Sequence, residues 1–167
     1  PPLEKARFTS HPASANGLLN SALIERHRLA DTYALVFVDG QFSAAHSDLS
    51  GLPDAVQVMS IAEALEICPD RVEPCLQGAA GAEEHGLLAF TTAYFRDGAF
   101  LRIPDGVALE KPVHLLHIAS APEGLAVLRH GIALGRQARA SVIETYAGDS
   151  DASYFTAAIT RIDLADG

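Results

Sequence analysis

Short apolar segments separated by turn residues make up the second half of the chain. Many of them end at Asp-Gly, Pro-Asp-Gly or Lys-Pro after a few residues. Segments this short favour strands, because a helix needs ten or more uninterrupted positions and proline removes a backbone donor. Everything after Asp97 is therefore predicted to be strand and turn. The predicted strands are AFLRI (99–103), GVAL (106–109), PVHLLHIA (112–119), LAVLRHGIAL (125–134), ASVIETYAG (140–148) and YFTAAITRIDL (154–164).

The first half shows a different pattern, with helices as well as strands. Residues 13–29 predict a short amphipathic helix that has Ser14 or Asn16 as its N-cap. Its predicted apolar face consists of Leu18, Leu19, Ala22 and Leu23. Further on, ALVFV (34–38) is an apolar run closed by Asp39-Gly40, a dipeptide suited to a tight hairpin turn. In VMSIAEALE (58–66), a serine followed three residues later by a glutamate forms a capping box, which predicts that a helix starts at Ser60.

The change between these patterns falls near residues 86–96. LLAFTTAYF (87–95) fits either a buried helix or a strand, so the chain is divided into a partly helical region, 1–86, and a strand-rich region, 87–167. Turn signals every 8 to 12 residues or so allow a sandwich, a barrel or a solenoid, and spacing alone does not choose among them. Two details favour a solenoid. The strand at 154–164 lacks clean apolar-polar alternation, and the segments beside Asp97 and Asp105 are too short to pair far as hairpins.

Several stretches resemble one family. These are AYFRDGAFLRIPDGVALEKPVHLLHI (93–118), ASVIETYAG and YFTAAITRI, with LVFVDGQF (35–42) and SIAEALE (60–66) upstream. In this order they are similar to the SufB/SufD family of iron-sulfur cluster assembly proteins, on its SufD branch. The resemblance implies a mainly β fold, in which a small α/β N-terminal region precedes a right-handed parallel β-helix, a single-stranded β-solenoid. Region 87–167 would then be the first part of the β-helix core.

The same resemblance implies a function. It predicts a non-catalytic scaffold subunit of the SufBCD complex in iron-sulfur cluster assembly and transfer, with SufB and the ATPase SufC as partners. Family members usually carry a tryptophan-containing stretch upstream, whereas this chain has no Trp, and they continue past the position of Gly167. The chain is therefore expected to be an internal fragment. The docking and cluster-assembly residues of the family lie in that later part, so no site residue is carried over and no cofactor is predicted here, since the full complex assembles the cluster.

A second function stays open at this point. Parallel β-helices also occur in carbohydrate-active proteins such as polysaccharide lyases, and a fold does not determine a function. Sugar-binding grooves use exposed aromatic platforms, and this chain has no Trp and only 7% aromatic residues. Composition therefore favours the scaffold over the polysaccharide lyase.

Charge and hydropathy limit the partners and the location. The formal net charge is -9 with 12 Lys and Arg, which excludes nucleic acid and anionic lipid as main partners, because both require clustered positive charge. No apolar run reaches the roughly 18 residues of a membrane span, and the first residues, PPLEKARF, lack the apolar core of a signal peptide. The sequence therefore predicts a cytoplasmic protein.

Cysteines and histidines give no predicted metal site. Cys68 and Cys75 are expected to be free thiols, with a disulfide and a redox or metal role as the alternatives. His114 and His117 are three residues apart on a predicted strand, where they point to opposite faces and cannot chelate one ion. His130, beside Arg129, and His85, beside Glu83 and Glu84, are expected to be solvated surface groups.

Aspartates give no predicted catalytic site either. Asp39, Asp97 and Asp105 each precede a glycine, where an aspartate usually serves turn geometry rather than acid catalysis. A glycoside hydrolase would need carboxylates clustered on one surface, and the spacing shows no such cluster. The sequence therefore predicts no enzyme, and no catalytic, cofactor-binding or metal-binding residue.

A solenoid that ends within its core exposes unpaired strands. The sequence therefore predicts an open β-helix end at residues 154–164, through which copies of the chain would associate as a homo-oligomer, or which a rearranged tail would cover.

Overall fold

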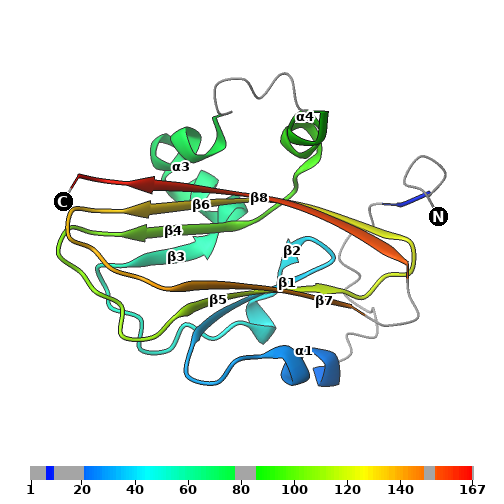
Figure 1. The fold of residues 1–167 in the computed structure, drawn as a ribbon, viewed down its shortest axis with the longest axis horizontal. Helices are drawn as coiled ribbons and strands as arrows, with labels where there is room; N and C mark the ends of the chain where they lie inside the picture. The colour runs from blue at the N-terminus through cyan, green and yellow to red at the C-terminus, as the bar shows by residue number, and fades with distance from the viewer. Residues whose placement is uncertain (1–6, 10–20, 78–85, 149–152, 167) are drawn as a thin grey trace.

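Two four-stranded β-sheets face each other in the computed structural model, which describes residues 7–9, 21–77, 86–148 and 153–166 (Figure 1). The first sheet has the order β2-β1-β5-β7. Its strands are β1 (Tyr33–Val38), β2 (Gln41–Phe42), β5 (Val113–Ala119) and β7 (Val142–Gly148). The second sheet has the order β3-β4-β6-β8. Its strands are β3 (Gln57–Ser60), β4 (Ala99–Ile103), β6 (Gly124–Leu134) and β8 (Tyr154–Leu164).

Helices cover the outer faces of both sheets (Figure 1). On the first sheet, Ile24 of α1 (Ser21–His27) is fully buried in a cluster with Val36 and Leu116. Against the second sheet lie α2 (Ile61–Ile67), α3 (Pro69–Leu76) and α4 (Gly86–Tyr94). A short 3-10 helix, Ala44–His46, follows β2. Because both faces of the sheets are covered, strands β1 and β5 are buried along their whole length.

The predicted right-handed parallel β-helix is wrong for this structure, which is mixed α/β with two open sheets. From β4 to β8, successive strands alternate between the two sheets and pair in parallel within each. However, β2 and β3 pair antiparallel with β1 and β4, so each sheet is mixed and ends on an antiparallel edge. Turns every 8 to 12 residues or so fit strands that cross between two sheets as well as they fit a solenoid, and for this reason the spacing did not distinguish them.

The core lies between the two sheets and follows the strand period of two. Tyr33, Leu35 and Phe37 of β1 point inward, where they pack with Leu101 and Leu128 of the second sheet. These five side chains are nearly inaccessible to solvent. The inward rows of all the strands therefore form one apolar layer between the sheets.

Several local predictions can be compared with the structure. The strands predicted at 99–103 and 154–164 have these bounds, and Asp39-Gly40 forms the predicted hairpin turn between β1 and β2, with both residues at positive φ. The ambiguous segment 87–95 belongs almost wholly to α4. The strand predicted at 106–109 is wrong, since this segment contributes one isolated bridge at Ala108.

The helix predicted at 13–29 is described only from Ser21 to His27. Its buried residue is Ile24, whereas the predicted face residue Ala22 is exposed. The predicted caps, Ser14 and Asn16, lie outside the described residues. Contact with the first sheet therefore sets the orientation of α1. The periodicity of the sequence alone does not predict this orientation.

The helix start at Ser60 is confirmed. Ser60 has an extended backbone, and its hydroxyl oxygen accepts a hydrogen bond of 3.0 Å from the backbone N–H of Glu63. Ser60 is 4% exposed, so its hydroxyl group is itself largely shielded from water.

Replacing Ser60 by Ala should lower the free energy of unfolding by about 0.5 to 2 kcal/mol, because one helix N–H loses its acceptor. Urea denaturation followed by circular dichroism measures this difference. Ser141→Ala, at an exposed position outside the helices, is the matched control and should leave the midpoint unchanged. Equal midpoints for Ser60→Ala and the wild type would contradict the capping role.

Candidate functional site

The side of the molecule between β7 and β8 is where both sheets end. Each of these strands is the last in its sheet, so one of its edges has no neighbouring strand among the described residues. The side chains of β7 and β8 that point toward the opposite sheet lie next to these two edges. We call this set of residues the open side. It includes Glu144 and Tyr146 of β7 and Thr160, Ile162 and Leu164 of β8.

Two buried histidines lie beneath the open side. His117 of β5 and His130 of β6 both point inward, and their ring centroids are 5.0 Å apart across the two sheets. The prediction of a solvated His130 is therefore wrong, since this residue is 1% exposed. It has the same parity on β6 as the core residues Leu128 and Ile132, and this alternation is the signal that could have identified it as buried.

Aromatic rings enclose His117. It stacks on Phe37 at 5.1 Å and on Tyr146 at 4.6 Å, between ring centroids. Neither of its ring nitrogens has a hydrogen-bond partner among the described residues. Burial, with the neighbouring His130 and His114, lowers the pKa of His117 to about 3, so the ring is neutral near pH 7.

His130 is held in one tautomer. Its Nδ1 accepts a hydrogen bond of 2.9 Å from the backbone N–H of Ala99, which places the proton of the neutral ring on Nε2. That Nε2 has no partner among the described residues. Burial lowers the pKa of His130 to about 4, although the carboxylate of Glu144 acts in the opposite direction. A protonated Nε2 is a poor metal ligand, so His130 is better suited to donating a hydrogen bond than to coordinating an ion.

A small polar network lies above the histidines. The hydroxyl groups of Tyr146 and Thr160 donate hydrogen bonds of 2.7 Å to the two carboxylate oxygens of Glu144. Burial and the bond to Glu144 raise the pKa of Tyr146, so its hydroxyl stays protonated and remains a donor. No motif in the sequence marks these three residues. Alternation along β7 and β8 could have placed them on one face, but only once the partner strands were known.

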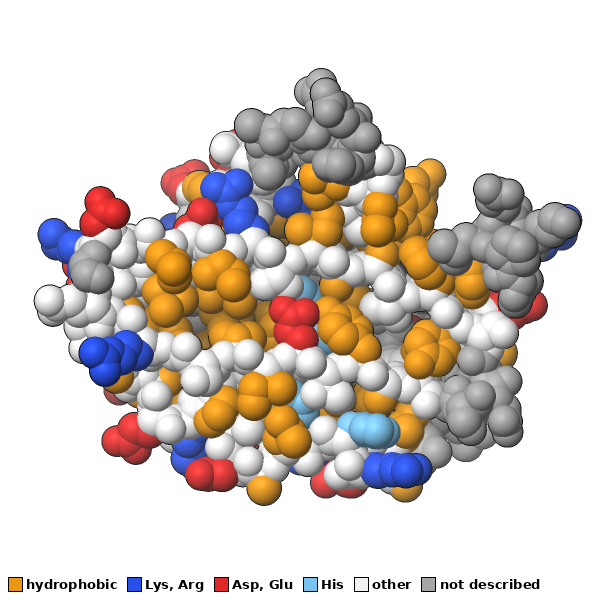
Figure 2. Space-filling model, viewed as in Figure 1, with side chains coloured by type: hydrophobic (Ala, Val, Ile, Leu, Met, Phe, Trp, Pro, Cys, Tyr) orange, Lys and Arg blue, Asp and Glu red, His pale blue; other side chains and the backbone are white. Residues whose placement is uncertain are grey.

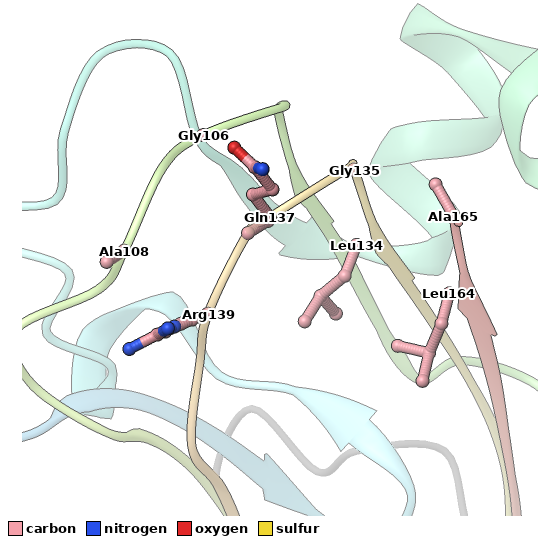
Figure 3. Close-up of a pocket in the computed structure, with 9 residues that line it drawn as sticks. Gly106, Ala108, Leu134, Gly135, Gln137, Arg139, Leu164 and Ala165 are labelled. Carbon is pink, nitrogen blue, oxygen red and sulfur yellow. The ribbon is translucent and has the colours of Figure 1, made fainter. Parts of the chain in front are cut away.

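Two cavities lie at the two ends of the open side. One, of about 670 Å³, is lined by the ends of β6 and β8 and by the turns at 106–108 and 135–139. In Figure 3, Leu134 and Leu164 lie side by side in this cavity, and Arg139 extends away from them. The other, of about 560 Å³, has His117 at its inner wall and Tyr146 and Tyr154 beside it. Both ends of the open side can therefore take up further side chains.

His114 lies on the opposite face of β5 from His117. Its Nε2 is 2.9 Å from the hydroxyl oxygen of Thr145, and its Nδ1 accepts a long hydrogen bond of 3.4 Å from the backbone N–H of Leu29. Burial, together with the charge of Arg28, lowers the pKa of His114. The structure therefore separates His114 from the pair of His117 and His130. The predicted surface residue His85 lies outside the described residues.

Each of the three aspartates that precede glycine binds at least one backbone amide far away in the sequence. Asp97 is 7% exposed and accepts hydrogen bonds from the backbone N–H groups of Phe42, Ala62 and Gly98. Asp39 accepts from Ser120 N–H and Oγ and from Ala121 N–H. Asp105 accepts from the backbone N–H and the side chain of Arg136. Their carboxylates therefore join turns to neighbouring strands, in addition to the turn geometry that the sequence predicted.

The predicted free thiols are confirmed for Cys68 and Cys75. Cys75 is buried against β6 beside Gly131, and burial raises the pKa of its thiol. Within the ranges that the structure describes, no three or more His, Cys, Asp or Glu side chains are grouped so that they could hold a metal ion. No helix in the same ranges has the length and hydropathy needed to cross a membrane.

A comparison with protein families matches residues 28–115 to the family described as SufBD protein N-terminal region. The matched segment begins just before β1 and ends within β5, so it includes the β1–β2 hairpin, the helix that starts at Ser60 and strand β4. A comparison with curated proteins finds no match to the chain.

Proposed function

Since the chain belongs to the SufB/SufD family of iron-sulfur cluster assembly proteins, we propose that it acts as a non-catalytic scaffold subunit of a SufBCD complex. The observation that carries this proposal is the family match over residues 28–115 of 167, more than half of the chain. In the proposal, SufB and the ATPase SufC are the partners. The iron-sulfur cluster is the cargo of the whole complex rather than a cofactor held by these residues.

We assign the chain to the SufD branch and to the cytoplasm as parts of the same proposal. Support for the SufD branch comes from the ordered resemblance of residues 93–118, 140–148 and 154–162 described above. Support for the non-catalytic scaffold role comes from three aspartates, whose carboxylates serve the structure. The carboxylates of Asp39, Asp97 and Asp105 accept hydrogen bonds from backbone amides, an arrangement that stabilises the structure.

Co-purification of the full-length protein tests the proposal. An affinity-tagged full-length protein, isolated from a native lysate without oxygen, should retain the SufB and SufC homologues in stoichiometric amounts. The tag alone, expressed at the same level, is the control. Recovery without either homologue would contradict the scaffold role. Release of unsaturated uronic acids from polysaccharides by the same preparation would instead support the carbohydrate-active alternative.

A further inference from the structure

The helix α1 depends on a small set of contacts for its place on the first sheet. It has seven residues, and its buried residue is Ile24, which packs in a cluster with Val36 and Leu116. A helix of this length is not stable by itself in water, so its structure requires the contact with the sheet. The family match begins at residue 28, directly after α1. A change in the contacts beside the helix can therefore release it from the sheet.

A side chain of β5 binds the first backbone amide beyond α1. The N–H of Arg28 closes the last turn of the helix by donating to the carbonyl of Ile24 at 2.9 Å. The next N–H, that of Leu29, donates instead to Nδ1 of His114 at 3.4 Å. An Nδ1 that accepts carries no proton, so the proton of the neutral ring is on Nε2, which donates to the hydroxyl oxygen of Thr145 at 2.9 Å. His114 is 0% exposed and therefore links the end of α1 to β7 inside the structure.

The titratable groups on the α1 side of His114 are mostly basic. They are Glu25, Arg26, His27 and Arg28, with His46 of the 3-10 helix. Figure 2 shows a histidine and a Lys or Arg side chain at the lower edge of the molecule, where Figure 1 places α1. The guanidinium of Arg28 pairs with Glu25 at 3.2 Å and also donates to the carbonyl of His46. Burial and the charge of Arg28 lower the pKa of His114, so this side of the ring disfavours its charged form.

The sheet around His114 offers no acidic partner. The residues in register with it are Ala34 of β1 and Ile143 of β7, which carry no charge. Asp48 lies beyond Ala34, with which it pairs through the backbone, and His117 points to the opposite face of β5. No carboxylate of the described residues forms an ion pair with His114. A proton on this ring would therefore gain no partner while α1 is docked.

Protonation of His114 conflicts with its contact to the end of α1. With a proton at Nδ1, the ring and the N–H of Leu29 would both be donors, and a positive charge would lie beside Arg28. We propose that His114 is a pH-sensitive latch for α1: the neutral ring holds Leu29 and keeps the helix on the first sheet, and protonation of the ring releases it. Release uncovers Val36 and Leu116, both fully buried while α1 is docked. The helix is thus a cover that acid removes from an apolar part of the sheet.

The size of the effect follows from the protons that each state binds. When α1 is released, the ring of His114 is in water and its pKa is near 6.5, whereas in the docked state its pKa is lower. The released state therefore binds more protons as the pH falls, and its share of the population rises. From pH 7 to pH 5 the rise is at most about 25-fold, the limit in which the docked ring takes up no proton. We expect a rise of at least about fivefold, because burial opposes protonation of the docked ring.

Hydrogen exchange of the full-length protein, followed by mass spectrometry, measures this release. The opening constant of the peptide that covers residues 21–29 should rise by at least about fivefold from pH 7 to pH 5, after correction for the pH dependence of intrinsic exchange. Amides of β5 should stay more strongly protected than those of α1 at both pH values, which distinguishes release of the helix from unfolding. NMR of the protein with 15N-labelled histidine should show the proton of His114 on Nε2 at pH 7. A proton on Nδ1, or equal opening constants at pH 7 and pH 5, would overturn the proposal.

Two substitutions on opposite faces of β5 make the test specific. His114→Asn places an amide oxygen near the position of Nδ1, where it can accept from Leu29 but cannot be protonated, so the opening of α1 should no longer depend on pH. His117→Phe is the matched control and should keep the pH dependence, because its ring points away from α1. A pH dependence that persists in His114→Asn, or one that disappears in His117→Phe, would assign the release to other groups and contradict the latch.

Discussion

Replacing Gly98 by Ala should remove most of the stability of the fold. A Cβ atom at this position would lie 1.6 Å from the carbonyl oxygen of Arg129 and 2.5 Å from its carbonyl carbon. These are backbone atoms of β6, which cannot turn away as a side chain can. The contact also cannot open locally, because the backbone N–H of Arg129 donates to the carbonyl of Asp97 and that of Ala99 donates to His130. We expect a loss above about 4 kcal/mol, at the extreme of single substitutions.

The control for this prediction is Gly86→Ala. Gly86 is the first residue of α4, and a Cβ atom there meets nothing within 4 Å. Alanine has the higher helix propensity, so this variant should be as stable as the wild type or more stable by up to about 1 kcal/mol. Urea denaturation of both variants measures the difference. A Gly98→Ala variant within about 1 kcal/mol of the wild type would mean that β4 and β6 are farther apart than described.

Acid should destabilise the protein through His117 and His130. In the unfolded chain both rings have an ordinary pKa near 6.5, whereas burial lowers the folded values to about 3 and about 4. Between these limits the unfolded state binds more protons, so the free energy of unfolding falls as the pH falls. Each histidine contributes a slope of about 1.4 kcal/mol per pH unit well below pH 6.5. Above about pH 7 these rings are neutral in both the folded and the unfolded state, so they no longer change the free energy of unfolding with pH.

His117→Phe separates this effect from the titration of carboxylates. Phenylalanine keeps the ring between Phe37 and Tyr146 and removes two nitrogens that have no partner among the described residues, so stability at pH 7 should be equal or higher. The loss of stability from pH 6.5 to pH 5 should be smaller than that of the wild type, because one of the buried rings that resist protonation is absent. Identical pH profiles for His117→Phe and the wild type would contradict the assignment.

The sequence predicts where strands begin and end better than it predicts which strands pair with each other. The bounds of β4 and β8 follow from turn residues on either side, which is local information. Which sheet each strand joins depends on partners far away in the sequence, and the resemblance led to a β-helix where the structure has two open mixed sheets. Repeated turns are common to both arrangements.

The candidate site was less predictable than the fold. The sequence predicts His130 on the surface, yet the charged residue beside it, Arg129, lies on the other face of β6, where its guanidinium donates to the carbonyl of Leu76. Glu144 and Thr160 meet across the two sheets, sixteen residues apart, at positions that gain meaning only from the strand register. The order of residues along the chain alone does not predict such a contact between two sheets.

The long sequence separation between β1 with its turn residue Asp39 and their partners has a consequence during synthesis on the ribosome. Its partner amide, at Ser120, lies 81 residues later, and β1 pairs along its whole length with β5, which also comes much later. A ribosome adds about 5 to 20 residues per second, so this partner follows after about 4 to 16 seconds. During that interval the six apolar residues of β1 lack the strand that covers one edge. The nascent chain therefore offers a binding site for chaperones that closes only when β5 has left the exit tunnel.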